Sequence, residues 1–201
     1  MATFFDFVRN QYTRLPVPPA PGNIADATYI VTGANTGLGY ECTKHLFNMG
    51  AKRIILGVRS LEKGEAALST LRNDTGRQDV GEVWPLDLLS LDSVEAFAKR
   101  MSTLDRLDGL IANAGVVMTQ FQIIEGIESS LLVNVVSTLL LGLRALPKLQ
   151  DSAHKLGTKP HLVFVLSRTA LERKVELNLE QLQGDMFDAL GKEEDFKPLL
   201  Q

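Results

Sequence analysis

The segment TGANTGLG, residues 32–39, constrains the fold of this 201-residue chain more than any other feature. It follows the apolar run Tyr29-Ile30-Val31 and precedes residues with a helical apolar period. Its glycines allow a buried strand to turn sharply into a helix and let the backbone approach a ligand. The free N–H groups and positive dipole end of such a helix favour a pyrophosphate. We therefore predict a cofactor-phosphate site formed by Thr32, Gly33, Asn35, Thr36, Gly37, Leu38 and Gly39.

Five short apolar runs alternate with segments of helical period, at residues 28–32, 53–58, 82–86, 108–112 and 161–167. The runs lack polar and apolar alternation, as Ile54-Ile55-Leu56 illustrates. Strands that helices cover on both faces have this pattern. We therefore predict an α/β fold, a Rossmann-like doubly wound parallel sheet in three α/β/α layers.

Two of the intervening helices have predicted packing faces. The first ends at Gly50 and presents Leu38, Cys42 and Leu46 to the core. The second begins at Ser90 and presents Val94, Phe97, Ala98 and Met101.

The most apolar segment runs from Leu131 to Leu146. It contains Asn134 and Arg144 among other polar residues, and it is too short and too polar for a bilayer, so we predict a buried helix and no transmembrane segment. An amide inside such a helix is costly unless it is hydrogen-bonded. For Asn134 this leaves two interpretations open, a structural hydrogen bond and a functional role.

A proline-rich linker predicts the domain organisation. Residues 15–23, LPVPPAPGN, contain four prolines and a glycine. We expect an N-terminal arm and linker over residues 1–23 and one nucleotide-binding domain over residues 24–201. The aromatic start, with Phe4, Phe5 and Phe7, either packs on that domain or contacts a membrane surface or a partner.

Composition excludes several classes of function. The net charge is -3 and the basic residues are dispersed, which argues against a nucleic-acid surface. The single cysteine, Cys42, and the three histidines lack the spacing of zinc ligands, so we predict no metal site. A lone cysteine and an N-terminus without a signal-peptide apolar stretch favour a reducing, cytoplasmic location.

The second apolar run ends at Arg59, 20 residues beyond Gly39. A dinucleotide fold chooses near this position between ribose hydroxyls and a 2′-phosphate. A guanidinium can bind a phosphate with two hydrogen bonds, so Arg59 favours NADP(H) over NAD(H). The alternative is that Arg59 is solvated surface.

Polar and small residues end the next three runs, where a ligand of this fold would lie. Asp87 either accepts from an adenine amino group or caps the following turn, and Leu88 packs beside the ring. Asn113, Ala114 and Gly115 let the backbone lie against a cofactor, and the Asn113 amide can brace two neighbouring strands. Ser167 is placed where a hydroxyl could hold a substrate carbonyl.

The chain resembles the short-chain dehydrogenase/reductase family over residues 26–167. The matching landmarks, in chain order, are the glycine motif with its leading Thr32, Asp87, Asn113-Ala114-Gly115, Asn134 and Ser167. The segments FFDFVRNQYTRLP and RSLEKGEAA further resemble fungal members encoded with polyketide or terpenoid biosynthetic enzymes. The resemblance implies hydride transfer between NADP(H) and a small-molecule alcohol or carbonyl. It also implies catalytic roles for Asn134 and Ser167, beside a tyrosine whose pKa a lysine lowers.

The family's Tyr-x-x-x-Lys does not follow the serine in this sequence. No tyrosine occurs after Tyr40, and none of the later lysines has a tyrosine four positions before it. Loss of a proton-transfer group costs about a hundred- to ten-thousand-fold in rate, so we expect ordinary reductase activity to be severely reduced.

The resemblance also implies a C-terminally shortened form that lacks the family's usual last strands and helices. The fifth strand would then lie at an exposed sheet edge, unless the tail, a protein partner or self-association covers it. The tail, residues 168–201, is interpreted either as a loop left by truncation or as a functional lid.

Three hypotheses follow for the function. The first is an NADP(H)-dependent oxidoreductase acting on a secondary-metabolite intermediate. The second is a redox-inactive relative that binds nucleotide or serves as a scaffold partner. The third is a non-redox isomerase, cyclase or dehydratase that uses the same pocket.

Overall fold

The computed structural model describes residues 9, 12, 24–167 and 191–193. The N-terminal arm with its phenylalanines and linker, apart from two isolated positions, lies outside the described residues. The same holds for the tail beyond Ser167, apart from residues 191–193. The predictions made for those segments therefore stay predictions.

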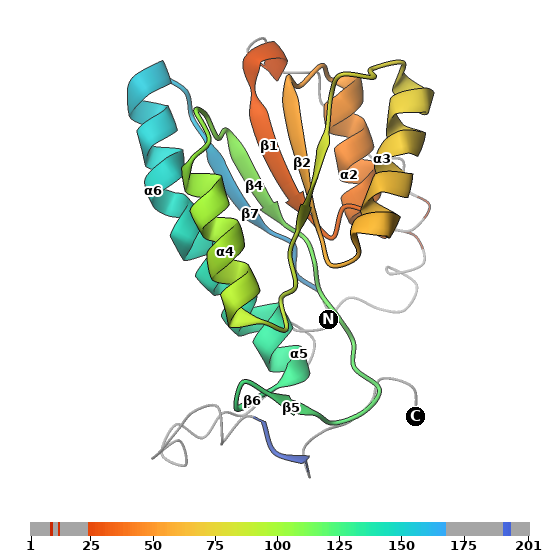
Figure 1. Ribbon diagram of the computed structural model, residues 1–201, viewed down its shortest axis with the longest axis vertical. Helices are drawn as coiled ribbons and strands as arrows, with labels where there is room; N and C mark the ends of the chain where they lie inside the picture. The colour runs from red at the N-terminus through yellow and green to blue at the C-terminus, as the bar shows by residue number, and fades with distance from the viewer. Residues whose placement is uncertain (1–8, 10–11, 13–23, 168–190, 194–201) are drawn as a thin grey trace.

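A five-stranded parallel sheet forms the centre of the described chain, in the order β3-β2-β1-β4-β7 (Figure 1). Its strands are β1 (Thr28–Thr32), β2 (Arg53–Val58), β3 (Glu82–Pro85), β4 (Gly109–Ala112) and β7 (His161–Phe164). The order runs outward from β1 in both directions, which confirms the doubly wound parallel fold.

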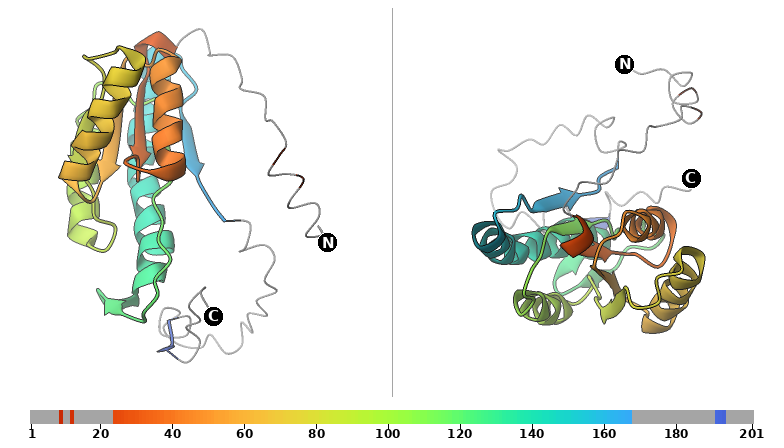
Figure 2. Two further views of the ribbon diagram at one scale, coloured as in Figure 1. Left: turned by 90° about the vertical axis from the view of Figure 1, so that its right-hand side faces the viewer. Right: turned by 90° about the horizontal axis from the view of Figure 1, so that it is seen from above.

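Helices cover both faces of this sheet (Figure 2). One layer holds α2 (Gly37–Asn48) and α3 (Leu61–Thr75), and the other holds α4 (Leu91–Ser102) and α6 (Thr138–Leu156). The short elements are η1 (Ile24–Asp26), β5 (Ile123–Ile124), β6 (Ile127–Glu128), α5 (Ser129–Leu131) and η2 (Leu132–Ser137).

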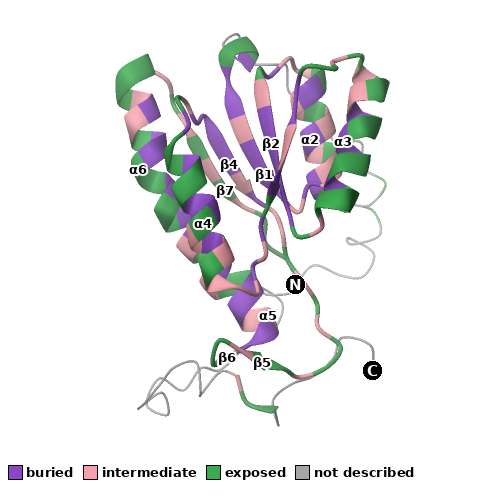
Figure 3. Cartoon of the chain, viewed as in Figure 1, coloured by how far each residue is buried: buried purple, intermediate pink, exposed green. Residues whose placement is uncertain are grey.

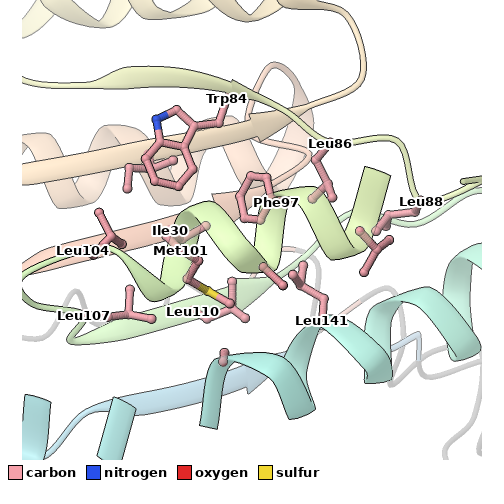
Figure 4. Packing of buried hydrophobic residues seen from close by; sticks show 14 of the residues in the cluster. Ile30, Trp84, Leu86, Leu88, Phe97, Met101, Leu104, Leu107, Leu110 and Leu141 are labelled. Atoms are coloured by element: carbon pink, nitrogen blue, oxygen red, sulfur yellow. The ribbon is translucent and has the colours of Figure 1, made fainter. Parts of the chain in front are cut away.

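Successive residues of the central strands pack alternately into two hydrophobic cores, one on each face of the sheet. Ile30 and Ile55 belong to the core under α4 and α6, whereas Val31 and Ile54 belong to the core under α2 and α3. Figure 4 shows the first core, where Trp84 and other large side chains pack between sheet and helices. Burial on both faces explains why β1 and β2 appear in the sequence as continuous apolar runs.

The predicted face of α4 is confirmed. Its N-cap Ser90 accepts a hydrogen bond from the Ser93 N–H at 3.2 Å, and all four predicted packing residues are buried. This face closes the core under the sheet, and the cap fixes where the helix begins beside the end of β3.

The predicted face of α2 is wrong for Leu38, although Leu46 does pack, partly buried, against the core on this side of the sheet. Gly39, Thr43 and Phe47 are its buried residues, while Leu38 is 74% exposed. The reason is that Gly39 must approach the turn before the helix, and this contact rotates the i, i+4 row of Gly39 toward the sheet. Leu38 is thereby directed to the edge of the sheet where the strands end.

The helix predicted from Leu131 to Leu146 is longer and less buried than predicted. Helical residues run without a break from Ser129 to Leu156, 28 residues that include an 18-residue stretch with a mean hydropathy of 1.6. By length and composition alone this segment could cross a membrane, so its predicted shortness is wrong. One side packs into the core through Leu141 and Ala145, as in a core helix, and the other side is exposed, as Figure 3 shows.

Strand β7 lies at one edge of the sheet, as predicted, although it ends at Phe164 rather than at residue 167. Its residues alternate between exposed and half-buried. Such alternation indicates that helices cover only one face of this strand.

Candidate functional site

An open cavity of about 480 Å³ lies across the carboxyl ends of the strands. Ten of the thirteen predicted cofactor residues line it: Gly33, Asn35, Thr36, Leu38, Arg59, Asp87, Leu88, Asn113, Ala114 and Gly115. These residues come from the loops after β1, β2, β3 and β4, which are far apart in the chain. The parallel sheet brings them together because all its strands end at the same edge.

The glycine turn depends on two special backbone positions. Gly33 has a φ of 65°, in the left-handed region that glycine adopts without a steric penalty. A side chain on Gly39 would meet the Gly33 carbonyl oxygen and the Asn113 amide nitrogen. Glycine at position 39 therefore allows the first turn of α2 to lie directly against the turn that precedes it.

The N-terminus of α2 lacks a side-chain cap. Thr36 is its N-cap residue, with a φ of -158°, but the Thr36 hydroxyl accepts no capping hydrogen bond. In α3 and α4, by contrast, Ser60 and Ser90 each accept one. The first N–H groups of α2 are thus left for another acceptor, beside a cavity that Thr36 lines. Together with the positive end of the helix dipole they form an anion-binding position.

Thr32 does not line the cavity and instead holds the floor of the cavity in place. Its hydroxyl oxygen accepts hydrogen bonds from the N–H groups of Asn113, at 3.0 Å, and Ala114, at 2.9 Å. The Asn113 side-chain amide donates to the Thr32 carbonyl at 3.0 Å. These bonds join β1 to the loop after β4, which is the bracing predicted for Asn113.

Arg59 lies at the rim of the cavity with its side chain exposed. Among the described residues, no side chain or carbonyl is hydrogen-bonded to its guanidinium. A neighbouring helix, α3, begins directly after Ser60. A cation without an internal partner, next to a helix N-terminus, is suited to bind a phosphate at this rim.

Asp87 takes part in a turn and also faces the cavity. One carboxylate oxygen accepts from the Leu89 N–H at 3.0 Å, and the Asp87 N–H donates to the Ser93 hydroxyl at 2.9 Å. The turn-capping interpretation is therefore confirmed. The other carboxylate oxygen makes no hydrogen bond within the described part of the chain, and buried Leu88 lies next to it as an apolar wall.

Asn134 makes structural hydrogen bonds, which confirms one of the two interpretations left open for it, but the residue is exposed rather than buried. It lies in η2, a π-helical segment, in which the wider turn shifts side chains away from the α-helical face. Its amide makes two hydrogen bonds with Val116: Oδ1 accepts from the N–H at 2.9 Å, and Nδ2 donates to the carbonyl at 2.8 Å. Asn134 thereby fixes the loop after β4, in which Gly115 and Val116 line the cavity.

Ser167 is not brought to the cavity. It lies three residues beyond the end of β7, is exposed, and is absent from the cavity lining. Asn134 does not line the cavity either, but it is hydrogen-bonded to Val116, which does.

No tyrosine lines the cavity in the described residues. Burial, followed by the negative charge of Asp108, raises the pKa of Tyr29. A raised pKa is the opposite of what a tyrosine proton donor needs near neutral pH. Burial likewise raises the pKa of the Cys42 thiol, which keeps it protonated and disfavours its use as a nucleophile.

Sequence reasoning missed six cavity residues: Gly57, Val58, Leu86, Leu89, Val116 and Val133. Most of these six residues lie beside a predicted cofactor-binding residue in the sequence. A prediction that included the neighbours of each strand end would have found them. Val133 comes from η2, and its direction depends on the π-helical turn, for which the sequence offers no signal.

Comparison with known proteins agrees with this geometry. A family model described as short chain dehydrogenase matches residues 27–178. The chain is 38% identical over 186 residues to the short chain dehydrogenase atnD of Emericella nidulans, covering 92% of this chain and 58% of that protein. It is 41% identical over 169 residues to the short chain dehydrogenase sol3 of Alternaria solani, covering 83% and 59%. The chain thus spans little more than half the length of these curated relatives.

Solved structures share the fold. A short-chain dehydrogenase from Sphingobium yanoikuyae in complex with NADPH superposes with a TM-score of 0.62 at 24% identity, covering 72% of this chain and 55% of that one. A protein from Escherichia coli assigned to the short chain dehydrogenases, also solved with NADPH, gives a TM-score of 0.55 at 30% identity, covering 70% and 58%.

Proposed function

Because the chain belongs to the short-chain dehydrogenase/reductase family, we propose that its cavity binds NADP(H). The uncapped N-terminus of α2 at the cavity carries this proposal. A pyrophosphate would accept hydrogen bonds from the first N–H groups of α2, and Gly33 and Gly39 keep side chains out of its way.

The two ends of the cavity suit the adenosine part of the same cofactor. Arg59 would bind the 2′-phosphate, which favours NADP(H) over NAD(H). The free carboxylate oxygen of Asp87 would accept from the adenine amino group, and Leu88 would pack against the ring. Ala114 and Gly115 would form a floor with little side chain, which Thr32 and Asn134 hold in place through the loop after β4.

We further propose an oxidoreductase function toward an alcohol or carbonyl. The nicotinamide ring of a bound NADP(H) supplies or accepts the hydride. The family resemblance assigns catalytic roles to Asn134 and Ser167. The fungal relatives and the segment RSLEKGEAA favour an intermediate of secondary metabolism as the substrate.

A second candidate is a redox-inactive relative that keeps the nucleotide site, or that uses it for isomerisation, cyclisation or dehydration. The position of Ser167 favours this candidate, since the serine lies outside the cavity and no tyrosine lines the cavity within the described chain. Nucleotide binding is common to the reductase and the nucleotide-binding relative, so binding is tested first.

NADPH binding is tested by fluorescence titration of the full chain. Wild type is expected to bind NADPH more tightly than NADH. Arg59→Ala should weaken NADPH binding about tenfold or more, because hydrogen bonds to a charged group contribute roughly 1.5–3 kcal/mol, and should leave NADH binding unchanged. Lys99→Ala, an exposed position on α4, is the matched control. No binding at millimolar NADPH, or equal losses for both cofactors, would contradict the proposed site.

Turnover separates the two candidates. NADPH oxidation by the full chain is measured against a panel of carbonyl compounds, with intact nucleotide binding verified in the same preparation. Slow, enzyme-dependent oxidation supports the oxidoreductase, and its absence with NADPH bound supports the redox-inactive relative. Turnover comparable with that of longer relatives would refute the inference drawn from the missing tyrosine.

A further inference from the structure

The loop between β3 and α4 carries Asp87 into the cavity and is anchored by two buried leucines. Leu86 and Leu88, on either side of Asp87, are 4% and 7% exposed, and both belong to the core under α4 and α6 (Figure 4). Asp87 itself lines the cavity and is only half-buried. Because the leucines fix this part of the loop, the direction of the carboxylate depends on the hydrogen bonds that Asp87 makes.

A ring of hydrogen bonds joins Asp87 to the first turn of α4. The Asp87 N–H donates to the Ser93 hydroxyl at 2.9 Å, and the Ser93 N–H donates to the Ser90 hydroxyl at 3.2 Å. The Ser90 N–H closes the ring by donating to the Asp87 carbonyl at 3.2 Å. Ser93 is both a donor and an acceptor in this ring, so it connects the cap of α4 to the end of β3.

The Ser93 side chain differs from that of a usual capping box. In a capping box the third residue of the helix, commonly Glu or Gln, reaches back to the N–H of the N-cap residue. Ser93 occupies this third position after the N-cap Ser90, but its hydroxyl accepts from Asp87, three residues before the cap. Capping does not require this bond, because Ser90 already accepts from Ser93. The bond acts on Asp87 instead.

The carboxylate of Asp87 has one oxygen fixed and one open. Oδ1 accepts from the Leu89 N–H at 3.0 Å. The backbone N–H of Asp87 is held by Ser93 at the same time, so the residue is fixed at both its main chain and its side chain. The second carboxylate oxygen makes no hydrogen bond within the described part of the chain, and it is thereby held in one direction beside Leu88, which lines the cavity.

We propose that Ser93 is a positioning residue that makes the cavity selective for an adenine base. This role rests on the proposed cofactor site, in which the open oxygen of Asp87 accepts from the adenine amino group. Hypoxanthine has a carbonyl oxygen in place of that amino group, so it offers the carboxylate a lone pair instead of an N–H. A carboxylate that cannot turn rejects such a base, whereas a carboxylate that is free to move can avoid the carbonyl. Ser93 itself is absent from the cavity lining, so it acts through Asp87.

Base selectivity tests this role. The dissociation constants of NADPH and of its hypoxanthine analogue, deamino-NADPH, are measured with the full chain by the fluorescence of the reduced nicotinamide, and their ratio gives the preference for adenine. Wild type should prefer NADPH about tenfold or more, because the amino group donates to a charged acceptor. Ser93→Ala should lower this preference about threefold or more, and Ser93→Thr, which keeps the hydroxyl, should restore it.

Ser152→Ala is the matched control. The Ser152 hydroxyl accepts from the Leu107 N–H at 2.9 Å, so this change also removes a hydroxyl that accepts from one backbone N–H. Leu107 lies just before β4, at the opposite end of the sheet from the cavity. The control should lose stability in urea and keep the wild-type preference for adenine.

A double-mutant cycle tests whether Ser93 acts through Asp87. Asp87→Ala should remove the preference for adenine, and the addition of Ser93→Ala to this variant should change the ratio of dissociation constants no further. Amide exchange measures the structural effect directly. The Asp87 N–H should exchange faster in Ser93→Ala than in wild type or in Ser152→Ala.

Three results would overturn the proposal. The first is equal affinity of wild type for NADPH and deamino-NADPH. The second is a preference for adenine that Ser93→Ala leaves unchanged, or that Ser152→Ala lowers to the same extent. The third is a further change of the ratio when Ser93→Ala is added to Asp87→Ala. In each case NADPH is still bound and the proposed cofactor site stands, whereas a wild-type chain that binds no NADPH would overturn both.

Discussion

Removing the Thr32 hydroxyl tests whether this one group holds the cavity floor in place. Thr32 is 1% exposed, and its oxygen accepts from two N–H groups, those of Asn113 and Ala114. In Thr32→Val the side chain keeps nearly the same shape, but the Ala114 N–H loses its acceptor, whereas the Asn113 N–H keeps the Ile111 carbonyl at 3.0 Å. One buried donor without a partner costs about 1–3 kcal/mol, so we expect a loss of about 1–3 kcal/mol.

The assay is urea unfolding followed by fluorescence of Trp84, the single tryptophan, which is 2% exposed. Thr32→Ser keeps the acceptor and should recover most of the loss. Thr43→Val is the matched control: Thr43 is fully buried, but its hydroxyl donates to the Gly39 carbonyl within α2, so no N–H group loses its acceptor. We expect it to cost less than about 1 kcal/mol. A Thr32→Val chain as stable as wild type, or no more affected than Thr43→Val, would refute the reasoning.

Two further predictions concern the turn and the sheet. Gly39→Ala should weaken NADPH binding at least about tenfold, because the new methyl group would meet the Gly33 carbonyl; an unchanged titration would contradict this. The hydrogen bond from Arg53 lowers the pKa of Glu82, against the effect of burial, and a bond from Trp84 lowers it further. Glu82 therefore stabilises the fold above its ordinary pKa of 4.5, and this contribution is lost as the pH falls through the lower folded pKa. Glu82→Gln should lose less stability than wild type between about pH 5 and pH 3 in urea unfolding, and parallel curves would refute this.

Local patterns in the sequence predicted the elements whose surroundings are uniform. β1 and β2 have the predicted bounds, because strands buried on both faces need an apolar side chain at every position. The face of α4 was also predicted correctly, because an amphipathic helix over a sheet repeats every 3.6 residues. Ten cavity residues were predicted because parallel strands bring their carboxyl ends to a common edge.

Predictions were wrong where a backbone contact outside the helix changed the direction of a helical side chain. Leu38 looked like a core residue, but the approach of Gly39 to Gly33 rotates α2 and exposes it. Asn134 lies in an apolar run, but the π-helical turn moves it toward Val116, which is 18 residues away in the chain. Neither rotation could be inferred from residue type and spacing, because each depends on a backbone contact made only in the folded chain.

The sequence by itself determined the layered fold, the glycine turn and the set of residues at the strand ends, because these follow from periodicity and from backbone freedom. The tertiary structure alone decided how each side chain is used. It leaves the N–H groups of α2 open while Thr32 binds the loop after β4, and it places Ser167 outside the cavity. Such assignments depend on which donors and acceptors meet across the sheet, and that geometry exists only once the strands have paired.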